Sequence, residues 1–544
     1  MSVAMTTGVE WSRHLVMLPI VLPLLCGAVL ATLTQGWHRL KFALAYGAVL
    51  ALLANAVALM HFADSEWKNG IGIYLAANWA APFGIALVAD RLAAAMLLLT
   101  SLLALAALHY AQPRWSRIGV HFHPLFQFLL MGINGAFLTH DLFNLFVFFE
   151  VMLAASYGLV LHGYNVERLR ASLQYIAVNL VAALFFLVGT ALIYATTGTL
   201  NMADIAARAA VLAGGDASLF KTGIAVLALA FLTKSAMWPL GFWLPTTYAA
   251  ASPPVAVMLV LMTKVGAYVI LRLWLLTFSG TAGDVARFGY EALLWGGMAT
   301  IVFGAAGMLA TDTAGRLAGY AAIVSSGTLL AVVGYGQPSL VTAGLYYFLA
   351  STLAIGAFVL LIELVDRIRT PGAAILALTA EAYAVEDMPA EPKGQGVPAA
   401  MALLSLAFAA CALTIAGLPP LSGFVAKFGM FHALLDPGPH APGIATAGWT
   451  LMALVFVSGL ISIISLMRFG VRTFWISDAA PPRLHAAELA PVFALLLVSV
   501  LMTVQAAPVF DYLARAGAAI HRPALYIDRV LGAKPVPAPV TRAP

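Results

Sequence analysis

DLFNLFVFFEVMLAASY, residues 141–157, places one carboxylate, that of Glu150, in the middle of an apolar segment with the character of a membrane-spanning helix. Large apolar side chains precede and follow Glu150 directly. A carboxylate at that depth in a bilayer is costly, and membrane proteins usually keep such groups for ion or proton handling. The stretch therefore predicts a spanning helix that carries a functional acid.

The composition of the whole chain agrees with this prediction. Of its 544 residues, 62% are hydrophobic and only 9% are charged, which excludes an ordinary soluble domain. Each span needs about 20 apolar residues, so the sequence predicts an all-α polytopic membrane protein with about 14 transmembrane helices. The predicted spans are residues 15–34, 40–61, 88–110, 121–140, 141–163, 168–196, 217–249, 254–278, 289–311, 315–334, 339–364, 398–436, 448–470 and 487–507.

The segments between the spans differ in character. Residues 62–87 combine charges, glycines and short β-prone runs, which predicts a surface loop or hairpin outside the membrane. Residues 200–213 alternate apolar and polar positions at helical spacing and are too short to span, which predicts an interfacial helix. Residues 365–397 are expected to form a flexible acidic loop, and the end of the chain, AKPVPAPVTRAP, a disordered tail.

The basic residues predict the orientation in the membrane. The net charge of +5 does not indicate nucleic-acid binding, because the basic residues cluster at span ends on alternate loops. Loops after odd-numbered spans carry most of the arginines, including Arg114, Arg168 and Arg316, and the positive-inside rule assigns such loops to the cytoplasm. With an even number of spans, both termini are predicted to lie outside.

Two of the predicted spans are interrupted by proline. Pro239 breaks the seventh, and Pro419 and Pro420 break the twelfth. Each broken segment also carries a lysine, Lys234 in the first and Lys427 in the second. Paired broken helices in the two halves of a chain are typical of inverted-repeat transporters, whose ion path lies near the midplane of the membrane.

Few ionisable residues lie well inside the spans: Glu150, Lys234, Lys264 and Lys427. Lysine suits a proton relay, because burial favours its neutral form and a neighbouring carboxylate restores its charge. We therefore expect Glu150 to form a charge pair with Lys234 whose strength depends on protonation, and the four residues to pass protons along a line. The alternative is that they form static ion pairs. Arg272, near the end of its span, is expected to extend to the headgroups.

Several weaker candidates accompany this line. His140 lies beside Asp141, which is expected to cap the fifth span. His140 could be a proton entry point, although a capped turn at the surface is the simpler interpretation. Ser325, Ser326 and Ser351 could hold water along a polar axis, or could simply bond one helix to another.

Motifs for enzyme chemistry are missing from the sequence. It holds no glycine-rich nucleotide loop and no cluster with metal-ligand spacing. Cys26 and Cys411 lie in apolar runs without a Cys-x-x-Cys motif, so neither a disulfide framework nor an iron–sulfur site is indicated. We expect no metal and no cofactor, and a transporter subunit rather than an enzyme.

Three long motifs resemble a known family. They are DLFNLFVFFEVMLAASYGL at 141–159, LTKSAMWPLGFWLPTTYAAASPPVAVMLVLMTKVGAY at 232–268, and GLPPLSGFVAKF at 417–428. They are similar to the antiporter-like subunits shared by complex I and the Mrp-type (Pha, Mnh) multisubunit monovalent cation/proton antiporters, the D-type antiporter subunits in particular. The resemblance covers nearly the whole chain, to about residue 470.

This resemblance implies a fold and a set of site residues. Glu150 matches the essential glutamate of the fifth span, and Lys234, Lys264 and Lys427 match the charged residues of spans seven, eight and twelve. The family fold has two inverted five-helix repeats, with helices 7 and 12 broken. The implied division is 1–120 for spans 1–3 with an external loop, 121–280 and 281–470 for the two repeats, and 471–544 for the last span and a disordered tail.

The eleventh span departs from the family pattern. Ala350 and Ser351 stand where many relatives carry histidines. The path between Lys264 and Lys427 is therefore expected to depend on water and hydroxyls. The candidate hydroxyls are those of Ser325, Ser326, Tyr346 and Ser351.

Taken together, these features predict a proton-translocating subunit of a multisubunit Na⁺(K⁺)/H⁺ antiporter in the bacterial cytoplasmic (inner) membrane. Its expected partners are the other antiporter subunits, protons, Na⁺ or K⁺ and the lipid bilayer, with no nucleic acid. Two alternatives remain open. One is a proton-pumping membrane subunit of a complex I-like or hydrogenase complex, which would make it part of an oxidoreductase translocase. The other is a scaffold subunit that transports nothing.

Overall fold

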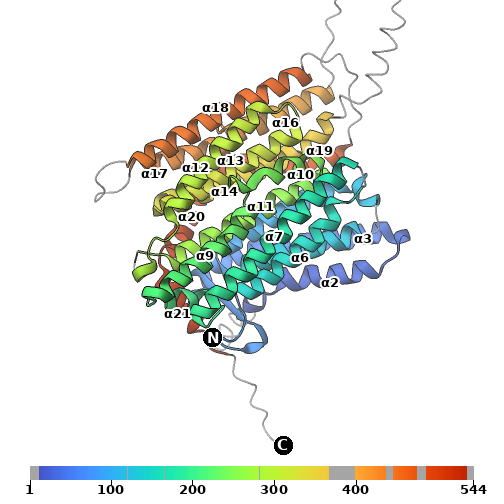
Figure 1. The fold of residues 1–544 in the computed structure, drawn as a ribbon. Helices are drawn as coiled ribbons and strands as arrows, with labels where there is room; N and C mark the ends of the chain where they lie inside the picture. The colour runs from blue at the N-terminus through green and yellow to red at the C-terminus, as the bar shows by residue number, and fades with distance from the viewer. Residues whose placement is uncertain are drawn as a thin grey trace, which may run out of the picture.

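The structure is a computed structural model that describes residues 12–118, 121–163, 166–280, 282–366, 399–436, 445–474 and 485–535. The helices lie side by side in one bundle, with α2 and α3 at one end and α16 and α18 at the other (Figure 1). The elements are α2 (Leu18–Thr32), α3 (His38–His61), β1 (Ile71–Leu75), β2 (Ala86–Asp90), α4 (Arg91–Ala111), α5 (Phe122–Leu138), α6 (Leu142–Val160), α7 (Val166–Thr197), α8 (Met202–Ala209), α9 (Gly214–Lys234), η6 (Leu240–Trp243), α10 (Leu244–Ala250), α11 (Pro253–Thr277), α12 (Tyr290–Ala310), α13 (Ala314–Tyr335), α14 (Pro338–Asp366), α16 (Ala399–Ala416), α17 (Ser422–Leu435), α18 (Thr446–Phe474), α19 (Ala486–Val504), α20 (Ala506–Ile520) and α21 (Pro523–Leu531).

The described helices confirm the predicted polytopic fold. Twelve of them are long and apolar enough to cross a membrane. The shorter apolar helices α2 and α5 occupy the predicted first and fourth spans, and α17 is the second half of the twelfth. Every predicted span therefore has its helix.

The seventh and twelfth spans are interrupted at the predicted prolines. Helix α9 ends at Lys234, and the chain passes Pro239 before η6 and α10 resume the helical path. Helix α16 ends at Ala416, and α17 begins at Ser422, after Pro419 and Pro420. Proline lacks the N–H that would continue a helical ladder, so breaks at these positions are expected. Side chains bond backbone groups at both breaks: the Trp238 N–H donates to the Thr300 hydroxyl at 2.9 Å, and Lys427 donates to the Ala416 carbonyl at 2.7 Å.

The segment after α3 forms the predicted hairpin. Strands β1 and β2 pair antiparallel, with Ile71 opposite Asp90 and Leu75 opposite Ala86. The predicted short helix also exists as α8, capped by the side chain of Asn201. Most of α8 is buried, including Met202 and Ile205, so it packs against the bundle rather than lying free on it.

The prediction that only a disordered tail follows the last span is wrong. Two further helices, α20 and α21, follow α19. Leu513, Ile520, Tyr526 and Val530 of these helices are buried. This apolar face explains why the segment folds back onto the bundle. Most of the predicted acidic loop (367–397) and the last nine residues (536–544) lie outside the described residues.

Helix α11 is the most enclosed span. Every one of its residues from Pro254 to Thr277 is buried. It contacts α4, α9, α13 and α14, helices that come from both halves of the chain. Lys264 lies near the middle of α11, on a helix that packs against both halves of the chain.

Candidate functional site

Glu150 lies on α6, whose start is fixed by Asp141 as predicted. The Asp141 carboxylate accepts a hydrogen bond from the backbone N–H of Asn144 at 2.8 Å. Glu150 is half-buried, and its charge interacts with that of Lys234. No N···O distance within 4.0 Å joins these two described side chains, so the predicted charge pair acts at longer range.

Lys234 lies at the last residue of α9, where the helix breaks. It is buried, and its ammonium donates to the Oδ1 atom of Asn179 on α7. The amide of Asn179 in turn donates to the Tyr175 carbonyl at 2.6 Å. Sequence reasoning missed Asn179, because an asparagine within a long apolar helix resembles an ordinary helix-bonding residue.

A small cavity lies beside Lys234, between α6, α7 and α11. Its volume is about 10 Å³, and Asn179, Lys234 and Thr263 supply polar atoms to its wall. A cavity of roughly this size holds one water molecule when several polar atoms surround it. Thr263, the residue before Lys264 on α11, lines this cavity, whereas Lys264 does not.

Lys264 is completely buried on α11 and bonds to hydroxyls from the second half of the chain. Its ammonium donates to Ser325 Oγ on α13 at 2.5 Å, and Ser325 Oγ lies 2.8 Å from Ser351 Oγ on α14. Of the predicted hydroxyls, Ser325 therefore bonds to Lys264 directly, and Ser351 bonds to Ser325. The hydroxyl of Ser326 is buried without a hydrogen-bond partner among the described residues.

The tyrosine of the eleventh span that faces this path is Tyr347, not Tyr346. Tyr347 lines the same small cavity as Ser325 and Ser351. The hydroxyl of Tyr346 donates instead to the Met502 carbonyl at 2.8 Å, on α19. Successive residues of a helix point about 100° apart, so a shift of one position exchanges the tyrosine that faces the path.

Lys427 stands on α17, beside the second helix break. Its ammonium donates to the carbonyl of Ala416, the last residue of α16, at 2.7 Å. The carbonyls at a helix end lack helical partners and carry partial negative charge, so they stabilise a cation. The two lysines of the broken helices therefore differ in position: Lys234 ends the first half-helix, and Lys427 lies on the second.

A second small cavity lies between the serines beside Lys264 and the break beside Lys427. Its volume is about 10 Å³, again close to the size of one water molecule. Ser325, Tyr347 and Ser351 line one side, and Thr414 and Ser462 supply hydroxyls on the other. The cavity borders the eleventh span, at which the sequence lacks histidines.

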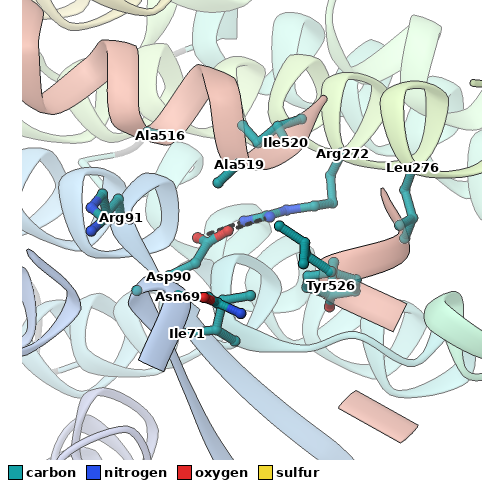
Figure 2. Close-up of a pocket in the computed structure, with 12 residues that line it drawn as sticks. Asn69, Ile71, Asp90, Arg91, Arg272, Leu276, Ala516, Ala519, Ile520 and Tyr526 are labelled. Atoms are coloured by element: carbon teal, nitrogen blue, oxygen red, sulfur yellow. Dashed lines mark hydrogen bonds and ion pairs between the residues drawn. The ribbon is translucent and has the colours of Figure 1, made fainter. Parts of the chain in front are cut away.

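The prediction that Arg272 extends to the headgroups is wrong. Arg272 is only 5% exposed. Its Nη1 and Nη2 atoms lie 2.5 and 2.8 Å from the two carboxylate oxygens of Asp90 (Figure 2). Nη2 also donates to the Tyr268 hydroxyl at 2.9 Å. Asp90 lies at the end of β2, 182 residues away in sequence. The sequence near either residue does not predict that Arg272 pairs with Asp90.

The interpretation of His140 as part of a surface turn is also wrong. His140 is buried, and its Nδ1 atom bonds to the Leu138 carbonyl at 3.0 Å. Burial, assisted by the charge of Arg272, lowers the pKa of His140 to about 3. The imidazole therefore stays neutral near pH 7. Among the described residues, no group of three or more His, Cys, Asp or Glu side chains could hold a metal ion.

Comparison with known proteins gives consistent results. Residues 139–462 match the family model described as NADH:quinone oxidoreductase/Mrp antiporter, transmembrane. The chain is 50% identical to the D-type subunit of a probable K(+)/H(+) antiporter from Rhizobium meliloti, over 96% of this chain and 98% of that protein. It is 33% identical to the D-type subunit of a Na(+)/H(+) antiporter from Alkalihalophilus pseudofirmus, over 95% of this chain and 99% of that protein.

The fold is similar to that of a chain in the Mrp complex from Dietzia. The TM-score is 0.81 at 27% sequence identity, and the match covers 96% of this chain and all of that chain.

Proposed function

The chain belongs to the NADH:quinone oxidoreductase/Mrp antiporter family of membrane proteins, and from that premise we propose that it is the proton-translocating subunit of a multisubunit Na⁺(K⁺)/H⁺ antiporter. It is a multi-pass membrane protein that works with the other antiporter subunits rather than an enzyme on its own. The two relatives described above differ in the cation that their names give, K⁺ in one and Na⁺ in the other. The choice between these cations is therefore left to experiment.

The observation that carries the proposal is that Lys234, Lys264 and Lys427 are all buried, each with its own hydrogen-bond acceptor. Lys234 bonds to Asn179 beside one water-sized cavity, and Lys264 bonds to Ser325 beside a second. Buried ammonium groups bear a high desolvation cost, so each readily gains or loses a proton when its neighbour's charge changes. Water in the two cavities would complete the path between the lysines.

Glu150 is the proposed start of this line. Its charge stabilises protonated Lys234 at a distance, and loss of the Lys234 proton removes that interaction. The change in charge at Lys234 then shifts the protonation equilibrium of Lys264. We propose that protons move stepwise through Glu150, Lys234, Lys264 and Lys427, coupled to cation efflux by the assembled complex.

The proposed membrane orientation follows from the loop charges. Arginine-rich loops after odd-numbered spans would face the cytoplasm, and both termini would lie outside, in the bacterial cytoplasmic membrane. The proposed repeats are residues 121–280 and 281–470. The helix breaks at Pro239 and Pro420, one in each repeat, support this division.

Substitution Glu150→Ala tests the proposal. In everted vesicles that contain the whole complex, we expect the variant to assemble and to lose cation-driven proton exchange with both Na⁺ and K⁺. Exchange at the wild-type rate by the assembled variant would exclude Glu150 from the relay and favour a scaffold role.

A further inference from the structure

A large pocket lies where the segment before α2, the loop before β1 and the end of α21 meet. Its volume is about 970 Å³, at the upper end of the range for sites that bind small organic molecules. Residues near both ends of the described chain therefore contribute to one wall. None of the residues of the proposed proton line, Glu150, Lys234, Lys264 and Lys427, lines this pocket.

The wall of this pocket carries an excess of positive charge. Its basic side chains are Arg13, Lys68, Arg529 and Lys534, and its one carboxylate is that of Glu66. None of the four basic side chains lies within 4.0 Å of a described carboxylate oxygen. In the proposed orientation this face lies outside the cytoplasm, where the positive-inside rule expects few basic residues. That rule therefore does not explain why four basic side chains meet here.

Arg529, on α21, presents an unsatisfied N–H group in this wall. Its Nε atom is buried and lacks a hydrogen-bond partner among the described residues. Its Nη2 atom donates to the Ile71 carbonyl at the long distance of 3.4 Å. Buried polar atoms in native proteins are nearly always satisfied, and the planar fork of N–H groups in a guanidinium matches the oxygens of a phosphate. Arg529 therefore indicates an anion with several oxygens as the ligand.

The rest of the wall has the character of a membrane interface. Trp67 and Tyr74 line the pocket, and the ring of Tyr74 packs edge-on against that of His14, with 5.7 Å between the ring centres. Tryptophan and tyrosine are enriched at the level of the lipid headgroups. Helix α2 begins directly after the segment that carries His14, and it exposes Leu25 and Val29, an apolar surface of the kind that contacts acyl chains. The pocket therefore lies where the end of a span meets the headgroups.

We propose that this pocket binds the phosphate-bearing headgroup of an anionic phospholipid such as phosphatidylglycerol. Arg529 donates to the phosphate oxygens, and Arg13, Lys68 and Lys534 supply the remaining positive charge. Because Arg529 belongs to α21 and Lys68 to the loop before β1, a bound headgroup joins the C-terminal helices to the hairpin. The lipid is therefore a structural ligand of this face of the subunit, and its binding does not depend on the proton line.

The first test is a titration of the purified whole complex with phosphatidylglycerol in neutral detergent, followed by native mass spectrometry. The double variant Lys68→Gln/Lys534→Gln removes two exposed charges from the pocket, and Arg522→Gln is the matched control, because Arg522 is exposed between α20 and α21 but does not line the pocket. We expect the double variant to weaken one phosphatidylglycerol site about 30-fold, since each basic side chain near a lipid phosphate contributes about fivefold. The control should bind as the wild type does. Equal affinities of the double variant and the control would overturn the proposal.

A second test separates a lipid from other sources of negative charge. We expect phosphatidylglycerol to raise the thermal midpoint of the wild-type complex, phosphatidylcholine and inorganic phosphate to leave it unchanged, and Arg529→Gln to abolish the rise. An equal rise with inorganic phosphate would overturn the lipid in favour of a free anion. Loss of another subunit from the purified Lys68→Gln/Lys534→Gln complex, with lipid binding unchanged, would overturn it in favour of an acidic segment of that subunit. Since the proton line does not touch the pocket, these outcomes leave the result expected for Glu150→Ala unaffected.

Discussion

Replacing Asn179 by leucine would remove the hydrogen bond that the Lys234 ammonium donates at the helix break. The leucine has a similar size but cannot accept a hydrogen bond from the ammonium. A hydrogen bond to a charged group contributes about 1.5–3 kcal/mol. Because each 1.36 kcal/mol is a factor of ten, we expect proton exchange to fall by about 10- to 150-fold.

The assay is cation-driven proton movement in everted vesicles, followed with a pH-sensitive dye and normalised to the amount of assembled complex. Asn134→Leu is the matched control, because Asn134 is equally buried but donates only to the Pro19 carbonyl, at 3.0 Å. The control should retain the wild-type rate per complex. A rate for Asn179→Leu equal to that of the control would refute the assignment of Asn179 to the relay.

Three further outcomes follow from the geometry. Tyr347→Phe should lower exchange by about two- to tenfold, because it removes a hydroxyl from the cavity that Ser325 also lines, whereas Tyr346→Phe should change the rate per complex less. Equal losses would contradict this assignment. Gly334→Leu should reduce the yield of folded complex, because a Cβ at Gly334 would lie 2.2 Å from the backbone nitrogen of Leu294; a normal yield and thermal midpoint would contradict the close packing of α12 on α13. The pKa of His140 is lowered from 6.5 to about 3, so an unfolded chain binds a proton there that the folded chain refuses. The contribution of neutral His140 to the free energy of unfolding is complete above pH 6.5 and is lost as the pH falls toward 3. His140→Gln should therefore flatten the fall of the thermal midpoint with pH across that window. An unchanged dependence of the midpoint on pH would contradict the burial of His140.

The four relay residues could be predicted from sequence because each breaks a local rule. Glu150, Lys264 and the lysines of the broken helices are charges in apolar segments, which is costly wherever the chain folds. Pro239 and Pro420 likewise break helices by their own chemistry. Such signals need no knowledge of neighbours.

The partners of these residues could not be predicted in the same way. Asn179 and Asp90 acquire their roles only through Lys234 and Arg272, which are 55 and 182 residues away in sequence. Tyr347, rather than the predicted Tyr346, faces the path. The rotation of α14 about its axis decides this, and that rotation is set by packing against neighbouring helices rather than by the sequence of the helix. The C-terminal helices were missed because they are short, and their apolar face is stabilised by contact with the bundle.

Substitution Lys264→Met tests the central claim most directly, since Lys264 bonds to Ser325 of the second half and lies next to the Thr263 wall of the cavity beside Lys234. The measurement is the pH change inside liposomes that contain the purified complex when a Na⁺ or K⁺ gradient is applied. A continuous line predicts an assembled complex that generates no cation-driven pH change. A pH change of wild-type size and rate from the Lys264→Met complex would contradict proton movement through this subunit.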